Sequence, residues 1–258
     1  MTYWTAIFLG IVQGLAEFLP ISSSGHLAVF QHFLNIGSLD GNLFFDVLLH
    51  LGTLAAVIIA FWPDVSTLFS EGFVMLHLKK LPRGKKPDML KRRLIWFIIL
   101  GTLPLLVIVF FKKYVESLSD NMFFIAFAFV LTGVLLFTAD RLGHGNKDEK
   151  SATASDALIV GLSQAVAVTP GISRSGATIC TGMLRGFDRN YAVRYSFLLS
   201  IPAVVGAFIM TLADAVKAGI EWSLVPMYLV GMVVAFVTGY AAIYLLRMIV
   251  QRGKFGGF

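Results

Sequence analysis

The sequence predicts an all-α polytopic membrane protein, an inverted-topology repeat with two re-entrant helical hairpins and about five to six transmembrane helices. Composition is the first observation: 57% of the 258 residues are hydrophobic and 14% are charged, whereas soluble domains contain nearer to a quarter charged residues. The second is a set of apolar stretches long enough to cross about 30 Å of hydrocarbon, which takes about twenty residues. The third is an internal repeat of two polar motifs.

Five apolar stretches have the length of a transmembrane helix. They lie at about 44–62, 94–111, 122–139, 191–213 and 224–246. No lysine or arginine occurs before Lys79, whereas a secretory signal peptide begins with basic residues. We therefore expect residues 1–258 to form a single integral membrane domain without a cleaved signal peptide.

Four other apolar stretches are too short to span a membrane. They lie at about 3–18, 25–36, 157–168 and 174–184. A polar motif separates the members of each adjacent pair, so each pair would enter and leave the membrane on one side. Irregular backbone at membrane depth is stable only where it is buried in protein or lines a wet cavity. The two hairpins therefore predict a polar site inside the membrane.

The two hairpins resemble each other in sequence. The segment GIVQGLAEFLPISSSGH (10–26) matches GLSQAVAVTPGISRSGA (161–177) without a gap, with seven of seventeen positions identical. Three predicted spans separate the copies, so they would enter the membrane from opposite faces. Repeat 1 then covers about 1–140 and repeat 2 about 156–258. The span at 122–139, the last of repeat 1, has no counterpart in repeat 2. Such an inverted repeat places its polar site between broken helices near mid-membrane.

The basic residues predict the orientation. Of the 21 lysines and arginines, eight lie at 63–93, three at 140–156, three at 185–194 and three after residue 246. With five spans and two re-entrant hairpins, these 17 residues fall on one side of the membrane, and three lysines fall on the other. Cytoplasmic loops carry the excess of basic residues. We therefore expect the N-terminus to lie outside.

Each hairpin turns through a hydroxyl-rich motif, so its second helix begins near 22–25 or 173–176. A helix N-terminus presents free N–H groups and about half a positive charge, which attract anions. Helix capping by serine is the alternative interpretation. The duplication and the presence of Arg174, whose planar donor fork matches phosphate, favour an anion site. The expected phosphate-binding residues are Ser22, Ser24, Gly25, Ser173, Ser175, Gly176 and Thr178.

Glu17 and His26 occur only in the first copy. Gln13 and Glu17 are four residues apart and share a helix face. A carboxylate beside an anion site implies a cation between them, and Mg²⁺ is usually held by one or two carboxylates and substrate phosphates. We therefore expect Glu17 and Gln13 to bind a metal ion. His26 would act as a general base, a general acid or a nucleophile, with a packed histidine as the alternative.

The charges of this predicted site match a diphosphate. Arg174, one Mg²⁺ and two helix ends supply about four positive charges, and Glu17 reduces the sum to about three. A diphosphate monoester carries about three negative charges near neutral pH. The agreement favours a diphosphate over a neutral ligand.

Three other features carry weaker signals. Asp46 and His50 share a helix face, which indicates either support for the site or a structural hydrogen bond. Cys180 is the only cysteine, so an internal disulfide is excluded, and we expect this residue to pack among apolar side chains. The run KKLPRGKKPDMLKRR (79–93) is interpreted as a solvated loop that sets the topology, with contact to anionic lipid as the alternative.

The segments QGLAEFLPISSSGH, FDVLLHLGT, PGISRSGAT and FLLSIPAVVGA closely resemble the bacterial undecaprenyl-diphosphate phosphatase family, also called bacitracin-resistance proteins. The resemblance covers essentially the whole chain. It implies hydrolysis of a C55 isoprenoid diphosphate to the monophosphate carrier and inorganic phosphate, with Mg²⁺ or Ca²⁺, during lipid-carrier recycling for cell-wall synthesis. It also implies a bacterial inner-membrane location, with two re-entrant hairpins that form a site open to the periplasm.

The resemblance also assigns site residues. The family's (E/Q)xxxE motif falls on Gln13 and Glu17, its Ser-Gly-His element on 22–26, and its second polar loop on 173–175. Two departures stand out. The first motif position is Gln13, often Glu in relatives, so a metal site here has one carboxylate fewer. The family usually has one more span near its C-terminus.

The sequence therefore predicts a membrane phosphatase. Arg174 and the two helix N-termini would neutralise the phosphate charge, and Glu17 would hold the metal ion. Either Ser23 or a neighbouring serine would attack the phosphorus with help from His26, or water would attack it directly. A transporter or flippase for anionic isoprenoid lipids is the rival, because inverted repeats with broken helices are common there. A carrier has no evident use for the carboxylate of Glu17. The expected partners are an isoprenoid diphosphate lipid and the membrane, without nucleic acid; a homodimer is left open.

Overall fold

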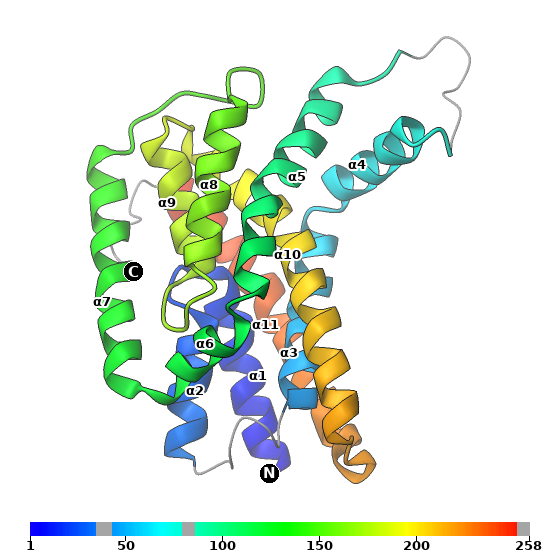
Figure 1. Ribbon diagram of the computed structural model, residues 1–258, viewed down its shortest axis with the longest axis vertical. Coiled ribbons are helices and arrows are strands. Elements are labelled where there is room, and N and C mark those ends of the chain that lie inside the picture. Colours follow the sequence, from blue (N-terminus) through cyan, green and yellow to red (C-terminus); the bar gives the residue numbers. More distant parts are fainter. Residues whose placement is uncertain (35–42, 79–85, 252–258) are drawn as a thin grey trace.

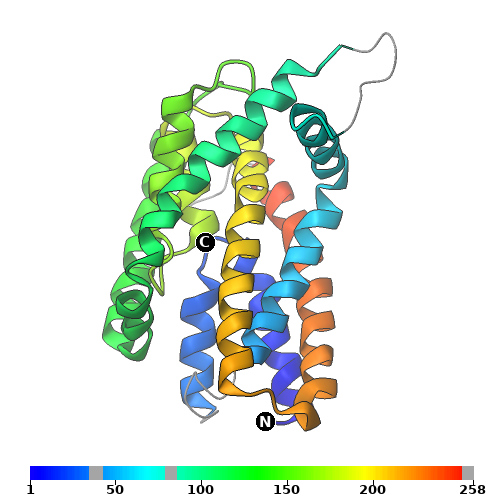
Figure 2. The ribbon, with the colours of Figure 1, turned by 45° about the vertical axis from the view of Figure 1, so that its right-hand side comes forward.

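The protein is an elongated bundle of helices in a computed structural model that describes residues 1–34, 43–78 and 86–251 (Figures 1 and 2). All named regular elements in these residues are helices, which confirms the predicted all-α class. In chain order they are α1 (Tyr3–Phe18), α2 (Ser23–Phe33), α3 (Leu43–Ala60), α4 (Trp62–Met75), α5 (Met89–Val109), α6 (Lys112–Ser117), η2 (Leu118–Asp120), α7 (Met122–Leu142), α8 (Ala154–Val166), α9 (Arg174–Leu184), α10 (Arg189–Ala218), η3 (Trp222–Leu224) and α11 (Val225–Gln251).

Five helical segments in the described residues are long and apolar enough to cross a membrane. They are Leu43–Ala60, Met89–Val109, Met122–Leu142, Arg189–Ala218 and Trp222–Val250. Each overlaps one of the five predicted spans, so the chain is a polytopic membrane protein. The apolar helices α1 and α8 have 16 and 13 residues, which is shorter than the twenty or so that a span requires.

The predicted loop at 63–93 contains helical structure at both ends. Pro63 and Asp64 lie in the first turn of α4, where proline loses no helical hydrogen bond and a carboxylate interacts favourably with the helix dipole. Asp88 caps α5, because its side chain accepts hydrogen bonds from two backbone N–H groups at 3.1 Å. Residues 79–85 lie outside the described residues. The run 79–93, interpreted as a solvated loop, includes the first residues of α5, from Met89 onward.

Two helical hairpins bring their turns together inside the bundle. Residues 19–22 join α1 to α2, and residues 167–173 join α8 to α9. Figure 1 shows the two hairpins entering from opposite ends of the bundle. The start of α9 meets the first turn where the Ser175 hydroxyl donates to the carbonyl of Leu19 at 3.4 Å. The re-entrant placement of the hairpins in a membrane and the inverted repeat remain predictions.

The first helix of each hairpin packs directly on a span from the other half of the chain. A Cβ atom at Gly10 of α1 would lie 2.6 Å from the carbonyl oxygen of Gly231 in α11. A Cβ atom at Gly161 of α8 would lie 2.4 Å from the carbonyl oxygen of Gly101 in α5. Small residues permit this close backbone contact between membrane helices. The two crossings therefore fix both hairpins within the bundle.

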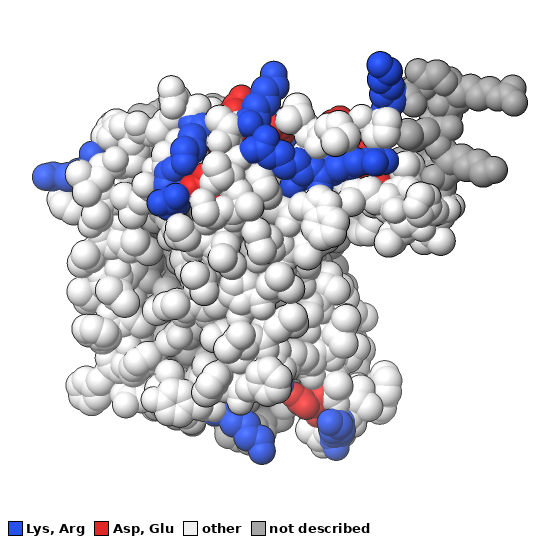
Figure 3. All heavy atoms as spheres, turned by 45° about the horizontal axis from the view of Figure 1, so that its top comes forward, with Lys and Arg blue, Asp and Glu red and all other residues white. Residues whose placement is uncertain are grey.

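On the face that Figure 3 shows, charged side chains gather at the two ends of the bundle, and the surface between them is largely uncharged. At the end that carries α4, Arg194 donates hydrogen bonds to Asp64 at 2.5 and 3.0 Å and to Glu149 at 2.8 Å. Burial by itself would raise the pKa of Asp64, but the hydrogen bonds and charge of Arg194 outweigh it and lower the pKa. At the opposite end Lys112 forms an ion pair with Asp214.

Candidate active site

The first polar turn is shaped by a proline and a strained serine. Leu19 precedes Pro20 and is extended, with φ −67° and ψ 144°, because a residue before proline avoids the helical region. Ser22 has a φ of +72°, a left-handed conformation that is uncommon for a residue with a side chain. Its hydroxyl accepts a hydrogen bond from the N–H of Gly25 at 3.4 Å and caps α2. The N-terminus of α2 is therefore held inside the bundle.

The second polar turn is capped in the same way. Ser173 Oγ accepts a hydrogen bond from the N–H of Gly176 at 3.0 Å and lies 3.2 Å from Ser175 Oγ. Thr178, in the next turn of α9, shares a 2.5 Å hydrogen bond with Ser196 of α10. The side chains of Ser173, Ser175 and Thr178 are all buried. These hydroxyls have protein partners, so the helix N-terminus is the main group that this turn presents to an anion.

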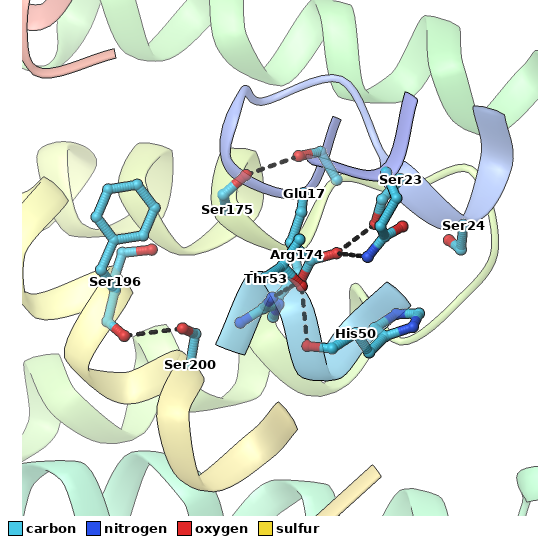
Figure 4. A network of polar contacts seen from close by, with 12 residues as sticks. Glu17, Ser23, Ser24, His50, Thr53, Arg174, Ser175, Ser196 and Ser200 are labelled. Atoms are coloured by element: carbon cyan, nitrogen blue, oxygen red, sulfur yellow. Dashed lines mark hydrogen bonds and ion pairs between the residues drawn. The ribbon is translucent and has the colours of Figure 1, made fainter. Parts of the chain in front are cut away.

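Glu17 connects the two turns (Figure 4). This residue is 7% exposed, and its carboxylate accepts hydrogen bonds from three side chains. Ser23 Oγ donates to Oε2 at 2.6 Å and Gln13 Nε2 donates to the same oxygen at 3.1 Å. Arg174 forms an ion pair with Oε1 across the two hairpins. Glu17 is therefore in direct contact with both other predicted catalytic residues, Ser23 and Arg174.

Ser23 and Arg174 occupy equivalent positions in the two hairpins. Each is the first residue of its helix and follows a serine cap, and the gapless alignment of the two motifs places them opposite each other. Both side chains reach the carboxylate of Glu17. The repeat thus supplies a hydroxyl from one copy and a cation from the other.

His26 lies beside this cluster on α2. Its Nδ1 is 2.8 Å from the carbonyl oxygen of Ser22; since a carbonyl only accepts, Nδ1 carries the proton in this bond. The ring packs against Phe129 of α7, with ring centres 4.9 Å apart. The hydroxyl of Ser23 donates to Glu17, so a carboxylate is positioned as its base. A catalytic role of His26 stays a prediction.

Ser24 and Gly25 complete the first turn. Ser24 is exposed, and its Oγ lies 3.5 Å from Ser22 Oγ. A Cβ atom at Gly25 would lie 2.6 Å from the ring of Phe129 and 2.9 Å from Cα of Gly171. Close packing between the two turns therefore requires glycine at position 25, whatever the ligand.

Sequence reasoning missed the contribution of α7. Its residue Thr132 accepts a hydrogen bond from the N–H of Ser173 at 3.2 Å and donates to the carbonyl of Gly171 at 3.4 Å. Phe129, three residues earlier, packs against the first turn. The only signal for this role was a hydroxyl within an apolar span. A contact over about forty residues leaves no local pattern in a single sequence.

Asp46 and His50 lie four residues apart on α3. Gln31 of α2 donates to Asp46 Oδ1 at 3.1 Å. His50 Nδ1 is 2.8 Å from the carbonyl oxygen of Asp46, and the Thr53 hydroxyl donates to the carbonyl of His50 at 3.0 Å (Figure 4). His50 and Glu17 are also close enough to interact electrostatically. These contacts connect α3 to α2 beside the site.

Gln13 and Glu17 provide oxygen ligands suited to a hard cation. Oε1 of Gln13 is buried and has no hydrogen-bond partner among the described residues. Mg²⁺ and Ca²⁺ accept amide and carboxylate oxygens as ligands. In the described part of the chain, however, no group of three or more His, Cys, Asp or Glu residues could hold a metal ion. The residues fit a cation whose coordination is completed by the phosphates of a substrate.

Comparisons with known proteins identify the family of the chain. A family model described as bacitracin resistance protein BacA matches residues 6–258. An undecaprenyl-diphosphatase from Alkaliphilus metalliredigens is 40% identical over 255 residues, covering 98% of this chain and 92% of that protein. A protein of the same name from Treponema denticola is 42% identical over 258 residues, covering 98% and 91%. The resemblance seen in the sequence motifs is therefore confirmed, and the chain belongs to the BacA bacitracin-resistance family.

Proposed function

We propose that this protein hydrolyses undecaprenyl diphosphate to undecaprenyl phosphate and inorganic phosphate. The reaction would recycle the lipid carrier for cell-wall synthesis and confer resistance to bacitracin. The family and the names of the relatives favour a phosphatase over a transporter. The observation that carries the proposal is the carboxylate of Glu17, which binds the hydroxyl of Ser23 from one hairpin and Arg174 from the other.

In the proposed reaction, Ser23 is the nucleophile. An arriving diphosphate competes with Glu17 for Arg174 and so frees the Glu17 carboxylate. This carboxylate accepts the hydroxyl proton of Ser23 as Ser23 Oγ attacks the terminal phosphorus of the diphosphate. The bond to the bridging oxygen breaks, and the lipid monophosphate leaves with that electron pair. Once Glu17 has lost its proton to solvent, it takes a proton from water as the water attacks the phosphoserine. It returns this proton to Ser23, and inorganic phosphate is released.

The remaining groups stabilise charge. The N-termini of α2 and α9 present N–H groups to the phosphates, and Arg174 binds oxygens of the transferred phosphoryl group. Mg²⁺ or Ca²⁺ held by oxygens of Glu17 and Gln13 would neutralise charge on the diphosphate. Phosphoryl transfer depends mainly on positioning and charge stabilisation, which this arrangement supports.

We place the active site on the periplasmic side of the bacterial inner membrane. The support is the charge distribution, with 17 basic residues in segments predicted to be cytoplasmic and three lysines in the segments opposite. In this orientation α1 and α2 form a re-entrant hairpin from the periplasm, and α8 and α9 form one from the cytoplasm. The homodimer left open by the sequence stays a prediction, which cross-linking in native membranes would test.

Phosphate release from purified protein tests the proposed reaction. With C55 isoprenoid diphosphate as substrate, we expect release that EDTA abolishes. Ser23→Ala and Glu17→Gln should each lower kcat/KM by about a hundredfold or more, because each removes one member of the nucleophile–base pair. Ser66→Ala is the matched control, because the Ser66 hydroxyl donates to the carbonyl of Pro63 within α4, and it should leave kcat/KM unchanged.

Other outcomes have distinct meanings. Binding of the lipid by folded wild-type protein without phosphate release would favour the transporter instead. If Ser23→Ala stays within threefold of wild type while Glu17→Gln is inactive, water rather than serine attacks the phosphorus.

A further inference from the structure

One threonine hydroxyl bonds to the backbone of the second polar turn at two points. Thr132 lies within α7 and is 4% exposed. Its Oγ1 accepts a hydrogen bond from the N–H of Ser173 at 3.2 Å and donates to the carbonyl of Gly171 at 3.4 Å. A hydroxyl can both donate and accept, which an aliphatic side chain of the same size cannot. Buried backbone groups that lose such a partner are costly, so the turn is strongly held to this side chain.

The same face of α7 leaves the turn little room. Gly171 has a φ of +87°, and a Cβ atom there would lie 2.7 Å from Cβ of Ala128 and 3.0 Å from the carbonyl oxygen of Ile125. Ile125, Ala128 and Thr132 follow the i, i+3, i+7 spacing of one helix face. The turn therefore cannot move closer to α7, and the hydrogen bonds of Thr132 oppose movement away from it.

α7 also contacts the first polar turn. Phe129 packs against Gly25 and against the ring of His26, while Thr132 holds the second turn. A single helix, which carries none of the predicted catalytic residues, thus touches both turns that form the site. Their relative position depends on α7 as well as on the Glu17–Arg174 ion pair.

We propose that Thr132 is a positioning residue, which sets the place of the Arg174 guanidinium relative to Glu17 and the substrate. Ser173, whose N–H Thr132 binds, directly precedes Arg174 in the chain. Release of this N–H would let the start of α9 shift and carry the guanidinium away from the phosphoryl oxygens. This inference rests on the proposed role of Arg174 in phosphate binding.

Three substitutions on α7 test the hydroxyl. Thr132→Val removes it with little change in shape, and Thr132→Ser retains it. Thr138→Val is the control, because the Thr138 hydroxyl donates to the carbonyl of Val134 in its own helix at 2.7 Å. We expect kcat/KM with C55 isoprenoid diphosphate to fall about tenfold or more in Thr132→Val, since misplaced catalytic groups lose rate steeply. Thr132→Ser and Thr138→Val should stay within about threefold of wild type.

Phosphate affinity gives a second measurement that needs no turnover. Inorganic phosphate should raise the thermal unfolding temperature of the wild type, and the concentration for half of this effect reports the affinity. Thr132→Val should raise that concentration about tenfold. In an Arg174→Ala background the same substitution should have little further effect on phosphate affinity or kcat/KM, because residues that act as one unit are not additive.

Each outcome decides the proposal. Wild-type kcat/KM and phosphate affinity in Thr132→Val would overturn it, and so would losses that add fully to those of Arg174→Ala. A lower unfolding temperature with unchanged phosphate affinity would also overturn it, because Thr132 would then only stabilise the fold. If the wild type binds phosphate but hydrolyses no lipid diphosphate, the proposed function fails, and the phosphate-affinity measurement still decides the role of Thr132.

Discussion

At the scale of single residues, the contacts of Glu17 explain why a buried carboxylate is stable here and how it would become reactive in the proposed reaction. A carboxylate buried to the extent of Glu17 requires compensation, and Arg174 with two neutral donors supplies it. The same contacts keep Ser23 in hydrogen-bond distance of the carboxylate that we propose as its base. An anion that draws Arg174 away removes part of the compensation and makes Glu17 a stronger proton acceptor. Substrate binding would thus activate the nucleophile.

Arg174→Lys separates a geometric role of this cation from a purely electrostatic one. A guanidinium binds two phosphate oxygens through its planar fork, whereas an ammonium is a point charge. We expect kcat/KM to fall about a hundredfold. Each tenfold loss of rate corresponds to about 1.4 kcal/mol of transition-state stabilisation. Arg185→Lys, at the end of α9 where Nε pairs with Asp156, is the matched control. A kcat/KM for Arg174→Lys within threefold of wild type would leave Arg174 as a counter-ion.

The sequence was sufficient to choose candidate residues that the structure brings together at Glu17, but not all of their contacts. The catalytic roles of these residues stay predictions. Glu17, Ser23 and Arg174 could be predicted because hydroxyls, a carboxylate and an arginine are conspicuous in apolar sequence. The pairing of Ser23 with Glu17 depends on the backbone at Ser22, whose positive φ no pattern announces. Thr132 was not predicted because its partners lie about forty residues away.

At the scale of helices, length and hydropathy predicted the five spans. The boundaries of the shorter helices depend instead on individual capping and turn residues. α4 has only 14 residues and its start depends on a proline and an aspartate, signals that are weak beside the charged run that follows. The contacts between α1 and α11 and between α5 and α8 were not predictable. They depend on glycines that the sequence does not distinguish from other glycines. Only the folded bundle shows which of them contact the backbone of another helix.

Gly161→Ala tests whether close contact between α8 and α5 positions the second hairpin. The new methyl group would lie 2.4 Å from the carbonyl oxygen of Gly101, so α8 must move away from α5. Overpacking of this kind costs about 1–3 kcal/mol, and we expect a lower thermal unfolding temperature together with a lower kcat/KM. Gly133→Ala on α7 is the control, because its Cβ atom would meet nothing within 4 Å. Equal unfolding temperatures for the two variants would contradict the packing argument.

At the scale of the whole molecule, the charge distribution relates the fold to the membrane. The surface between the two charged ends is largely uncharged in Figure 3, as a bilayer requires, and basic side chains are more numerous at the end that carries α4. The sequence predicted this distribution because basic residues could be counted between the spans. The ion pairs of Arg194 with Asp64 and Glu149, which join α10, α4 and the linker at that end, could not be predicted from the sequence.

Cysteine labelling tests the proposed orientation of the protein and therefore the side of its active site. Ser223 and Asn146 are both exposed. Ser223 lies in the connection between α10 and α11 and Asn146 in the connection between α7 and α8, and Figure 1 shows these two connections at opposite ends of the bundle. The native Cys180 is fully buried, so the wild type should remain unlabelled. In spheroplasts, a membrane-impermeant maleimide should label Ser223→Cys, while Asn146→Cys should react only after permeabilisation. The physical reason is that the excess of basic residues at the Asn146 end keeps this end in the cytoplasm. The reverse labelling pattern would place the first hairpin and the proposed site on the cytoplasmic side.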